Sequence, residues 1–249
     1  MSSIKNIENF YFVGIGGIGM SALARYFNLQ GKKVFGYDKT PSEITNTLIH
    51  EGITIQFKDE VSLIPELIQK NKNTLIVCTP AIPKNNKIIS WLNAKEYSIT
   101  KRSELLGEIS KNSICLAVAG THGKTTTSAI LGHLLASCNM PVTAFLGGVT
   151  ENYNSNLIYK GSEIMVVEAD EFDRSFLHLK PTIACITSMD ADHLDIYGTT
   201  SALEKTFIEF SKLVPDSNNL LFKKGLPLEG KTVSATENAD FEARNVRIE

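Results

Sequence analysis

A chain of 249 residues is long enough for one large domain or two ordinary domains with substantial cores. Its hydrophobic residues (43%) and charged residues (21%) have ordinary globular proportions, which excludes a disordered chain. The net charge of −2 excludes a general attraction to nucleic acid or to an anionic membrane, so phosphate binding must come from local loops.

The sequence predicts a cytoplasmic protein. No apolar run approaches the roughly 20 residues that span a bilayer, and the N-terminal MSSIKNIENF lacks the apolar stretch of a signal peptide. The four cysteines form no C-x-x-C pair, and Cys78, Cys115 and Cys185 lie in apolar runs typical of strands. We therefore expect buried, reduced thiols, as in a reducing compartment. The sequence does not indicate an oligomeric state.

Predicted strands and helices alternate along the first hundred residues. The strands are expected at residues 10–13, 33–37, 53–57 and 75–78. The helices are expected from Ser21, as the capping residue, to the stop at Gly31, and then over residues 42–51 and 85–95. This alternation predicts a parallel sheet covered on both faces.

A second unit is predicted to begin near Ser113, after a linking helix over residues 102–112. A buried strand at 114–119 leads through a glycine loop into a helix at 124–137. Further strands are expected at 164–167, 183–187 and 220–222, and a helix at 204–213. We therefore predict two tandem doubly wound α/β domains, a Rossmann-like domain over residues 1–107 and a P-loop ATPase-like domain over residues 108–249.

The first glycine-rich loop lies between a predicted strand and a predicted helix. Gly14, Gly16 and Gly19 fit G-x-G-x-x-G, whose glycines allow a tight turn and place a diphosphate at a helix N-terminus. Asp38 follows Gly19 by 19 residues, at the end of the next strand, where a carboxylate can bind ribose hydroxyls. The pattern alone also fits an NAD-dependent dehydrogenase, or glycines that only permit close packing. It predicts a diphosphate site without naming the diphosphate.

The second glycine-rich loop ends in the G-K-T of a phosphate-binding loop. Its backbone N–H groups are expected to wrap phosphates, Lys124 to reach the β and γ oxygens, and the Thr125 hydroxyl to bind Mg²⁺. Val118 departs from the first glycine of G-x-x-x-x-G-K-[ST]. The preceding buried strand and the carboxylates farther along the chain support the interpretation, which makes ATP and Mg²⁺ the expected ligands.

Two acidic clusters follow predicted strands of the second unit. The first is EADEFD, in which Glu168 lies nearest its strand and is the expected Mg²⁺ ligand. Its other carboxylates fit direct contact or a solvated acidic loop equally. The second is DADHLD, where His193 lies among three aspartates and could hold a second Mg²⁺ or orient a phosphate.

In their order and spacing, GIGGIGMSALA, AVAGTHGKTTT, VVEADEFDRSFLHL and DADHLDIYG resemble the Mur ligase family over essentially the whole chain. The sequences of these motifs are most similar to those of family members that add L-alanine. The resemblance implies an N-terminal domain for UDP-N-acetylmuramate and a central ATPase domain. It also implies ATP-dependent amide formation through an acyl phosphate, with L-alanine as the attacking amine, in peptidoglycan synthesis.

The resemblance also implies roles for individual residues. Lys124, Glu168 and His193 would be catalytic; Thr125 and Glu168 would hold one Mg²⁺, and His193 would help hold a second. The implied ATP-binding residues are Gly120, Thr121, His122, Gly123, Lys124, Thr125 and Thr126. The implied UDP-sugar-binding residues are Gly14, Gly16, Gly17, Ile18, Gly19, Met20, Ser21, Asp38 and Thr79.

The chain departs from the family pattern in two places. Lys205 does not align with the carbamylated lysine of several sister ligases, so that role is not assigned. The family continues beyond Glu249 into adenine-contacting segments and a domain that helps bind the amino acid. We therefore expect the chain to bind the UDP-sugar without ligating it.

Two further interpretations stay open from the sequence. One is the recycling ligase of the same family, which joins a tripeptide to UDP-N-acetylmuramate. The other is a nucleotide-binding module without activity.

Overall fold

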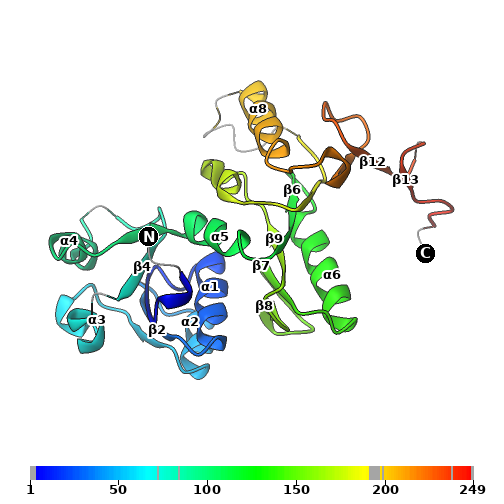
Figure 1. Ribbon diagram of the computed structural model, residues 1–249. Helices are drawn as coiled ribbons and strands as arrows, with labels where there is room; N and C mark the ends of the chain where they lie inside the picture. The colour runs from blue at the N-terminus through cyan, green and yellow to red at the C-terminus, as the bar shows by residue number, and fades with distance from the viewer. Residues whose placement is uncertain are drawn as a thin grey trace. The chain divides into compact units, whose positions relative to one another are not determined.

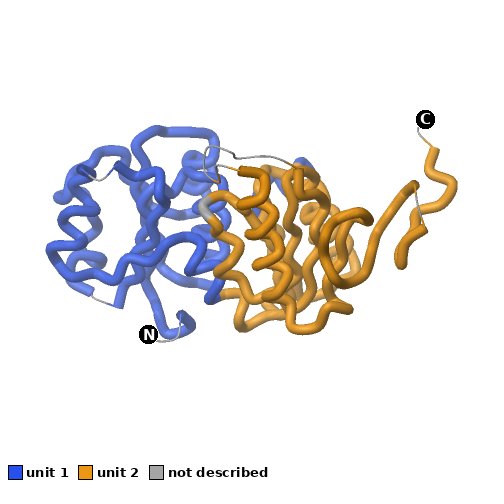
Figure 2. Tube along the Cα trace, turned by 90° about the horizontal axis from the view of Figure 1, so that it is seen from above, with its two compact units in different colours: residues 1–108, 151–157 blue, residues 109–150, 158–249 orange. Residues whose placement is uncertain are grey.

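The computed structural model describes residues 4–71, 73–83, 85–190, 197, 199–236 and 238–247, with only the main chain for Asp173. The chain divides into two compact units, coloured separately in Figure 2. Unit 1 comprises residues 1–108 and 151–157, and unit 2 comprises residues 109–150 and 158–249. Within the described ranges, no helix is long and apolar enough to cross a membrane.

Unit 1 is built on a parallel sheet of five strands in the order β3-β2-β1-β4-β5, of which β2 and β4 are labelled in Figure 1. The strands are β1 (Asn9–Val13), β2 (Lys33–Tyr37), β3 (Thr54–Gln56), β4 (Thr74–Cys78) and β5 (Ile99–Lys101). The helices are α1 (Ile18–Leu29), α2 (Glu43–His50), α3 (Glu66–Lys70), α4 (Lys87–Ala94) and α5 (Arg102–Ser110), with short 3-10 helices η1 (Ile4–Asn6) and η2 (Val61–Leu63). The strand order reverses between β1 and β4, which is where ligands bind in open α/β sheets.

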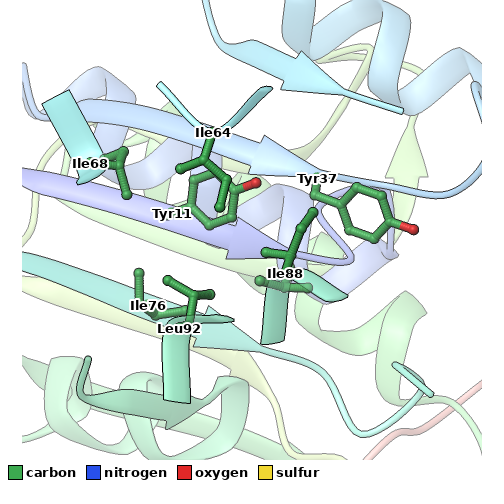
Figure 3. Close-up of a cluster of buried hydrophobic side chains, with 8 residues drawn as sticks. Tyr11, Tyr37, Ile64, Ile68, Ile76, Ile88 and Leu92 are labelled. Carbon is green, nitrogen blue, oxygen red and sulfur yellow. The ribbon is translucent and has the colours of Figure 1, made fainter. Parts of the chain in front are cut away.

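Consecutive side chains of β1 point to opposite faces of this sheet, and helices pack on both faces. On one side, the ring of Phe10 stacks on Phe27 of α1, with centroids 3.9 Å apart. On the other side, Tyr11 packs among apolar residues of α3 and α4 (Figure 3). The members of this cluster are Tyr11, Val13, Tyr37, Ile64, Ile68, Ile76, Ile88 and Leu92.

Helix α1 begins earlier than the sequence suggested. Ser21 was expected to cap the helix, but Gly17 is the N-cap and the helix runs from Ile18. Ser21 therefore lies inside the first turns, where its hydroxyl donates to the carbonyl of Ile18 at 2.9 Å. The expected cap was wrong because a glycine with extended backbone angles can begin a helix without any capping side chain.

Residues 151–157 are grouped with unit 1, and Asn156 bonds to residues of α1. Asn156 is fully buried, and its amide donates to the carbonyl of Ile18 and, at 2.9 Å, to the hydroxyl of Ser21. Its side-chain oxygen accepts from the guanidinium of Arg25, which also bonds to Glu51 at 2.9 Å. This network satisfies a buried arginine and holds the N-terminal turn of α1, directly after the first glycine-rich loop.

Unit 2 is built on a sheet of eight strands in the order β13-β12-β11-β10-β6-β9-β7-β8, whose edge strand β8 begins in the residues grouped with unit 1. The strands are β6 (Ile114–Ala119), β7 (Val142–Thr150), β8 (Ser155–Tyr159), β9 (Ile164–Glu168), β10 (Ile183–Ile186), β11 (Leu220–Lys223), β12 (Lys231–Ser234) and β13 (Phe241–Glu242). The helices are α6 (Lys124–Ser137) and α8 (Thr200–Ser211), with 3-10 helices η3 (Phe172–His178) and η4 (Ser217–Asn219). Strand β6 lies between β9 and β10 and pairs with both in parallel, so the loops after these three strands share one edge.

Helix α6 packs closely on β7, because a Cβ at Gly132 would lie only 2.6 Å from the Cβ of Ala144. A second cluster joins η3 to α8, where the ring of Phe176 stacks on Phe210 at 4.7 Å and meets Phe207 edge-on. These two contacts fix the elements that begin after the loops of β6 and β9.

The prediction of two α/β units is confirmed; the sheet of unit 1 is parallel as expected, whereas the sheet of unit 2 is mixed. Strand β6 and helix α6 have the expected bounds, whereas β5, β7, β8, β12, β13 and α3 were not expected. Strand β7 was not predicted because it contains the adjacent glycines Gly147 and Gly148, and paired glycines are more typical of loops than of strands. All four cysteines are free; Cys115 is buried as expected, Cys78 and Cys185 are half-buried, and Cys138 is exposed.

Candidate functional site

The first glycine-rich loop turns sharply at the end of β1. Gly14 has a φ of +87°, and its N–H donates to the carbonyl of Tyr37 at 2.7 Å. The N–H of Gly16 donates to the Oδ2 of Asp38 at 2.8 Å, so Asp38 braces the loop. A ribose bound beside Asp38 would therefore share its carboxylate with the loop backbone.

The structure brings Thr79, which follows β4, against the same loop. A Cβ at Gly14 would lie 2.6 Å from the Cγ2 of Thr79, so only glycine allows this approach. Gly17 is exposed at the start of α1, and Ile18 and Gly19 are partly exposed in its first turn. The side chains of Met20 and Ser21 are buried beneath the loop. The predicted UDP-sugar residues thus gather at the switch point of the sheet, with these two side chains turned inward.

Arg102 adds a positive charge that sequence reasoning placed only in a linking helix. A Cβ at Gly19 would lie 3.1 Å from both the Cδ and the Cζ of Arg102, the first residue of α5. A guanidinium beside a helix N-terminus suits a diphosphate, because both attract anions. The sequence held no signal for this pairing, since 83 positions separate the two residues.

The second glycine-rich loop lies between β6 and α6 and is braced by the residues after β10. The Thr121 hydroxyl is 2.8 Å from the Ser188 hydroxyl, and the N–H of His122 donates to the same Ser188 oxygen at 2.9 Å. Gly120 has a φ of +130°, and a Cβ there would lie 2.8 Å from the backbone nitrogen of Ser188. Gly123 is also left-handed, with a φ of +80°. The loop is therefore shaped before any phosphate arrives.

Lys124, the first residue of α6, points back into this loop. Its Nζ donates to the carbonyl of Gly120 at 2.7 Å and to the Oε1 of Glu171 at 2.9 Å. Glu171 is fully buried, and the Lys124 side chain is 15% exposed. The sequence contained Glu171 within EADEFD, but nothing there distinguished it from its acidic neighbours.

Thr125, the second residue of α6, meets Glu168, the last residue of β9. The Thr125 hydroxyl lies 2.9 Å and 3.0 Å from the two carboxylate oxygens of Glu168. The N–H of Gly147, on β7, donates to Glu168 Oε2 at 2.8 Å and fixes its direction. A hydroxyl and a carboxylate side by side are hard oxygen donors, and their chemistry fits Mg²⁺ next to nucleotide phosphates. Gly147 was not singled out by the sequence, because a strand there was not expected.

The remaining predicted residues are less informative. Thr126 is exposed on the first turn of α6, and His122 is exposed with its Nε2 4.0 Å from a carboxylate oxygen of Asp190. His193 lies outside the described residues. Tyr197 donates its hydroxyl to the backbone carbonyl of Glu171, and burial of the phenol raises its pKa above the ordinary value. Its role was not expected, and it helps to hold the segment that carries Glu171.

Both units match a known protein family. Residues 9–113 match "Mur ligase family, catalytic domain", and residues 118–244 match "Mur ligase middle domain". The UDP-N-acetylmuramate–L-alanine ligase of Christiangramia forsetii is 56% identical over 100% of this chain and 55% of its own length. That of Flavobacterium psychrophilum is 58% identical over 99% of this chain and 55% of its own length. The chain thus spans about half the length of the curated relatives it matches.

A solved structure agrees with these matches. The UDP-N-acetylmuramate-alanine ligase of Thermotoga maritima has a TM-score of 0.80 and 28% identity, covering 92% of this chain and 53% of that chain. A match to the middle domain over half of the chain, together with the two loops described above, leads to one conclusion: the chain belongs to the Mur ligase family.

Proposed function

We propose that this chain is the UDP-sugar- and ATP-binding part of an enzyme that joins L-alanine to UDP-N-acetylmuramate at the expense of ATP. The observation that carries the proposal is the arrangement around the second glycine-rich loop. There Lys124 and Thr125 lie at the start of α6, and the Thr125 hydroxyl meets Glu168 at the end of β9, as a triphosphate with Mg²⁺ requires. The choice of substrates is supported by two relatives named UDP-N-acetylmuramate–L-alanine ligase, which are 56% and 58% identical to this chain.

The proposed reaction has two steps. A carboxylate oxygen of the sugar's lactyl group attacks the γ-phosphorus of ATP, and the bond from that phosphorus to the bridging oxygen breaks, releasing ADP and leaving an acyl phosphate. The L-alanine amine then attacks the acyl carbon, loses a proton, and expels phosphate from the tetrahedral intermediate. The product is an amide, and ATP has supplied the energy for its formation.

The main obstacle is charge, because a carboxylate must approach a triphosphate. Lys124 would neutralise β and γ oxygens, and the backbone N–H groups from Gly120 to Thr125 would hold the phosphates in place. Mg²⁺ held by Thr125 and Glu168 would supply further positive charge at the oxygens as they meet. His193 is proposed to help hold a second ion.

The first glycine-rich loop is proposed to bind the UDP diphosphate. Its N–H groups at the start of α1 and the neighbouring guanidinium of Arg102 favour an anion there. Asp38 and Thr79 border the same place and would contact the uridine moiety. Membership of the Mur ligase family argues against the NAD-dependent dehydrogenase that this loop alone would suggest.

Thermal unfolding tests the proposal, with UDP-N-acetylmuramate, ATP–Mg²⁺ and NAD(H) added separately. A ligand at a hundredfold excess over its dissociation constant stabilises a protein by about 2.7 kcal/mol, which is a readable shift. We expect stabilisation by the UDP-sugar and by ATP–Mg²⁺. The Lys124→Ala variant should lose the stabilisation by ATP–Mg²⁺ and keep the stabilisation by the UDP-sugar. Stabilisation by NAD(H) and not by the UDP-sugar would refute the proposal.

The recycling ligase is the remaining candidate within the family, because it uses the same sugar nucleotide. Both candidates predict the same binding by the two loops, so they differ only in the attacking amine. Amide formation by a full-length protein that contains this chain, with L-alanine or with the tripeptide as the amine, would separate them. We expect L-alanine to be used.

A further inference from the structure

The ammonium of Lys124 is held from two sides within the second glycine-rich loop. One hydrogen bond runs to the carbonyl of Gly120 at 2.7 Å and one to the Oε1 of Glu171 at 2.9 Å. A lysine ammonium has three N–H donors, so these bonds leave one for an incoming oxygen. The side chain is only 15% exposed, which limits the directions from which that oxygen can come.

Glu171 is the fixed member of this pair. Its side chain is fully buried, and its backbone carbonyl accepts from the N–H of Arg174 at 3.0 Å and from the hydroxyl of Tyr197. Lys124, in contrast, carries its charge on a flexible stem of four carbons. The carboxylate is therefore the anchor and the ammonium the group that it places.

We propose that Glu171 is a positioning residue that fixes the Lys124 ammonium for the phosphates of ATP and stays bonded to it after they bind. This inference rests on the proposed function of the loop. Fixing the lysine beforehand removes a loss of rotamer freedom that binding would otherwise have to overcome. The same carboxylate places a negative charge near the phosphates, which opposes binding. The two effects have opposite signs and must be separated.

Two neutral substitutions separate them. Glu171→Gln keeps a carbonyl oxygen that can accept from Lys124, and Glu171→Met fills a similar volume with no such oxygen. Because both variants lack the carboxylate charge, the ratio of their dissociation constants for ATP–Mg²⁺ reports the anchor alone. Calorimetric titration of the 249-residue chain should show the Gln variant binding at least as tightly as the unchanged protein. The Met variant should bind about tenfold more weakly than the Gln variant, the scale of the freedom that a long side chain loses when fixed.

The controls keep folding and function apart. Affinity for UDP-N-acetylmuramate should be equal in all variants, since that ligand is proposed to bind in unit 1. Glu209→Met removes a glutamate from an exposed ion pair with Arg174 and should leave the ATP–Mg²⁺ affinity unaltered. Equal affinities of the Gln and Met variants would overturn the inference. Absence of binding of both ATP–Mg²⁺ and tripolyphosphate–Mg²⁺, which needs no contact with adenine, by the unchanged chain would instead refute the proposed function of the loop, and this role with it.

A second measurement does not depend on a variant that folds. In a crystal structure of the unchanged chain with ADP and Mg²⁺, the Nζ of Lys124 should remain within hydrogen-bond distance of Glu171 Oε1. A lysine that has swung away to the phosphates would show that the pair is broken by the nucleotide, and would overturn the inference.

Discussion

Gly147→Ala should disturb the proposed Mg²⁺ site without a direct change to any of its ligands. A Cβ at Gly147 would overlap most with the Oε2 of Glu168, and would lie 2.7 Å from its Cδ and 2.8 Å from its Oε1. Because ordinary van der Waals contact begins near 3.4 Å, the carboxylate must retreat by about 0.7 Å. A displacement of this size along its bond to the Thr125 hydroxyl would lengthen that bond from 2.9 Å to roughly 3.6 Å, which is no longer a hydrogen bond.

The loss of one charge-assisted hydrogen bond and of a fixed carboxylate direction corresponds to about 1.5–3 kcal/mol. We therefore expect ATP–Mg²⁺ to bind roughly ten- to a hundredfold more weakly, with the loss growing as Mg²⁺ is lowered. Calorimetric titration of ATP at several Mg²⁺ concentrations measures both effects. Affinity for UDP-N-acetylmuramate should not change.

The next residue provides a matched control. A Cβ at Gly148 would meet only the Cγ2 of Thr125, at an ordinary 3.5 Å, so Gly148→Ala should bind ATP–Mg²⁺ nearly as the unchanged chain does. Neither glycine has a left-handed φ, so backbone strain does not separate the two substitutions. Equal affinities for the two alanine variants would refute the reasoning, because only the Gly147 variant overlaps with Glu168, whereas the Gly148 variant makes an ordinary van der Waals contact.

Three further outcomes are expected. Gly120→Ala should lower the urea midpoint and abolish ATP–Mg²⁺ binding, because alanine would take a φ of +130° and press on the backbone nitrogens after β10; binding at normal affinity would contradict this. A thiol reagent at neutral pH should modify Cys138 first and Cys115 last, because burial raises the pKa of Cys115 to about 12 and keeps it protonated; peptide mapping would reveal a different order. Asn156→Ala should cost about 1–3 kcal/mol of stability and weaken UDP-sugar binding, because it releases the first turn of α1; an unchanged urea midpoint would count against the network.

The sequence predicted best what is local. Strand β6 and helix α6 were expected with their observed bounds, because a buried apolar run, a glycine loop and a long helical pattern follow one another directly. The two glycine-rich loops were found for the same reason. Ser21 was misread as a cap, because serine is a common N-cap and Gly17 carries no side chain that would signal one.

The partners of the loop residues could not be predicted from the sequence, because folding brings them together from distant positions in the chain. Ser188 braces Thr121 from 67 residues away, and Glu171 meets Lys124 across 47. No periodicity or motif encodes such a meeting; it follows from β6 lying between β9 and β10. For Glu171, the residue type was visible, but its neighbours had the same charge and only burial distinguishes it.

The segment 151–157 has a consequence for the order in which the chain can fold during synthesis. The buried partner of Arg25 is Asn156, which lies 131 residues farther along the chain and is therefore synthesised much later. When the first 108 residues have left the ribosome, the five strands of their sheet can pair, but the start of α1 still lacks the amide that holds it. Unit 1 therefore reaches its final state late, after β6, α6 and β7 have been made, although nearly all of its residues come first.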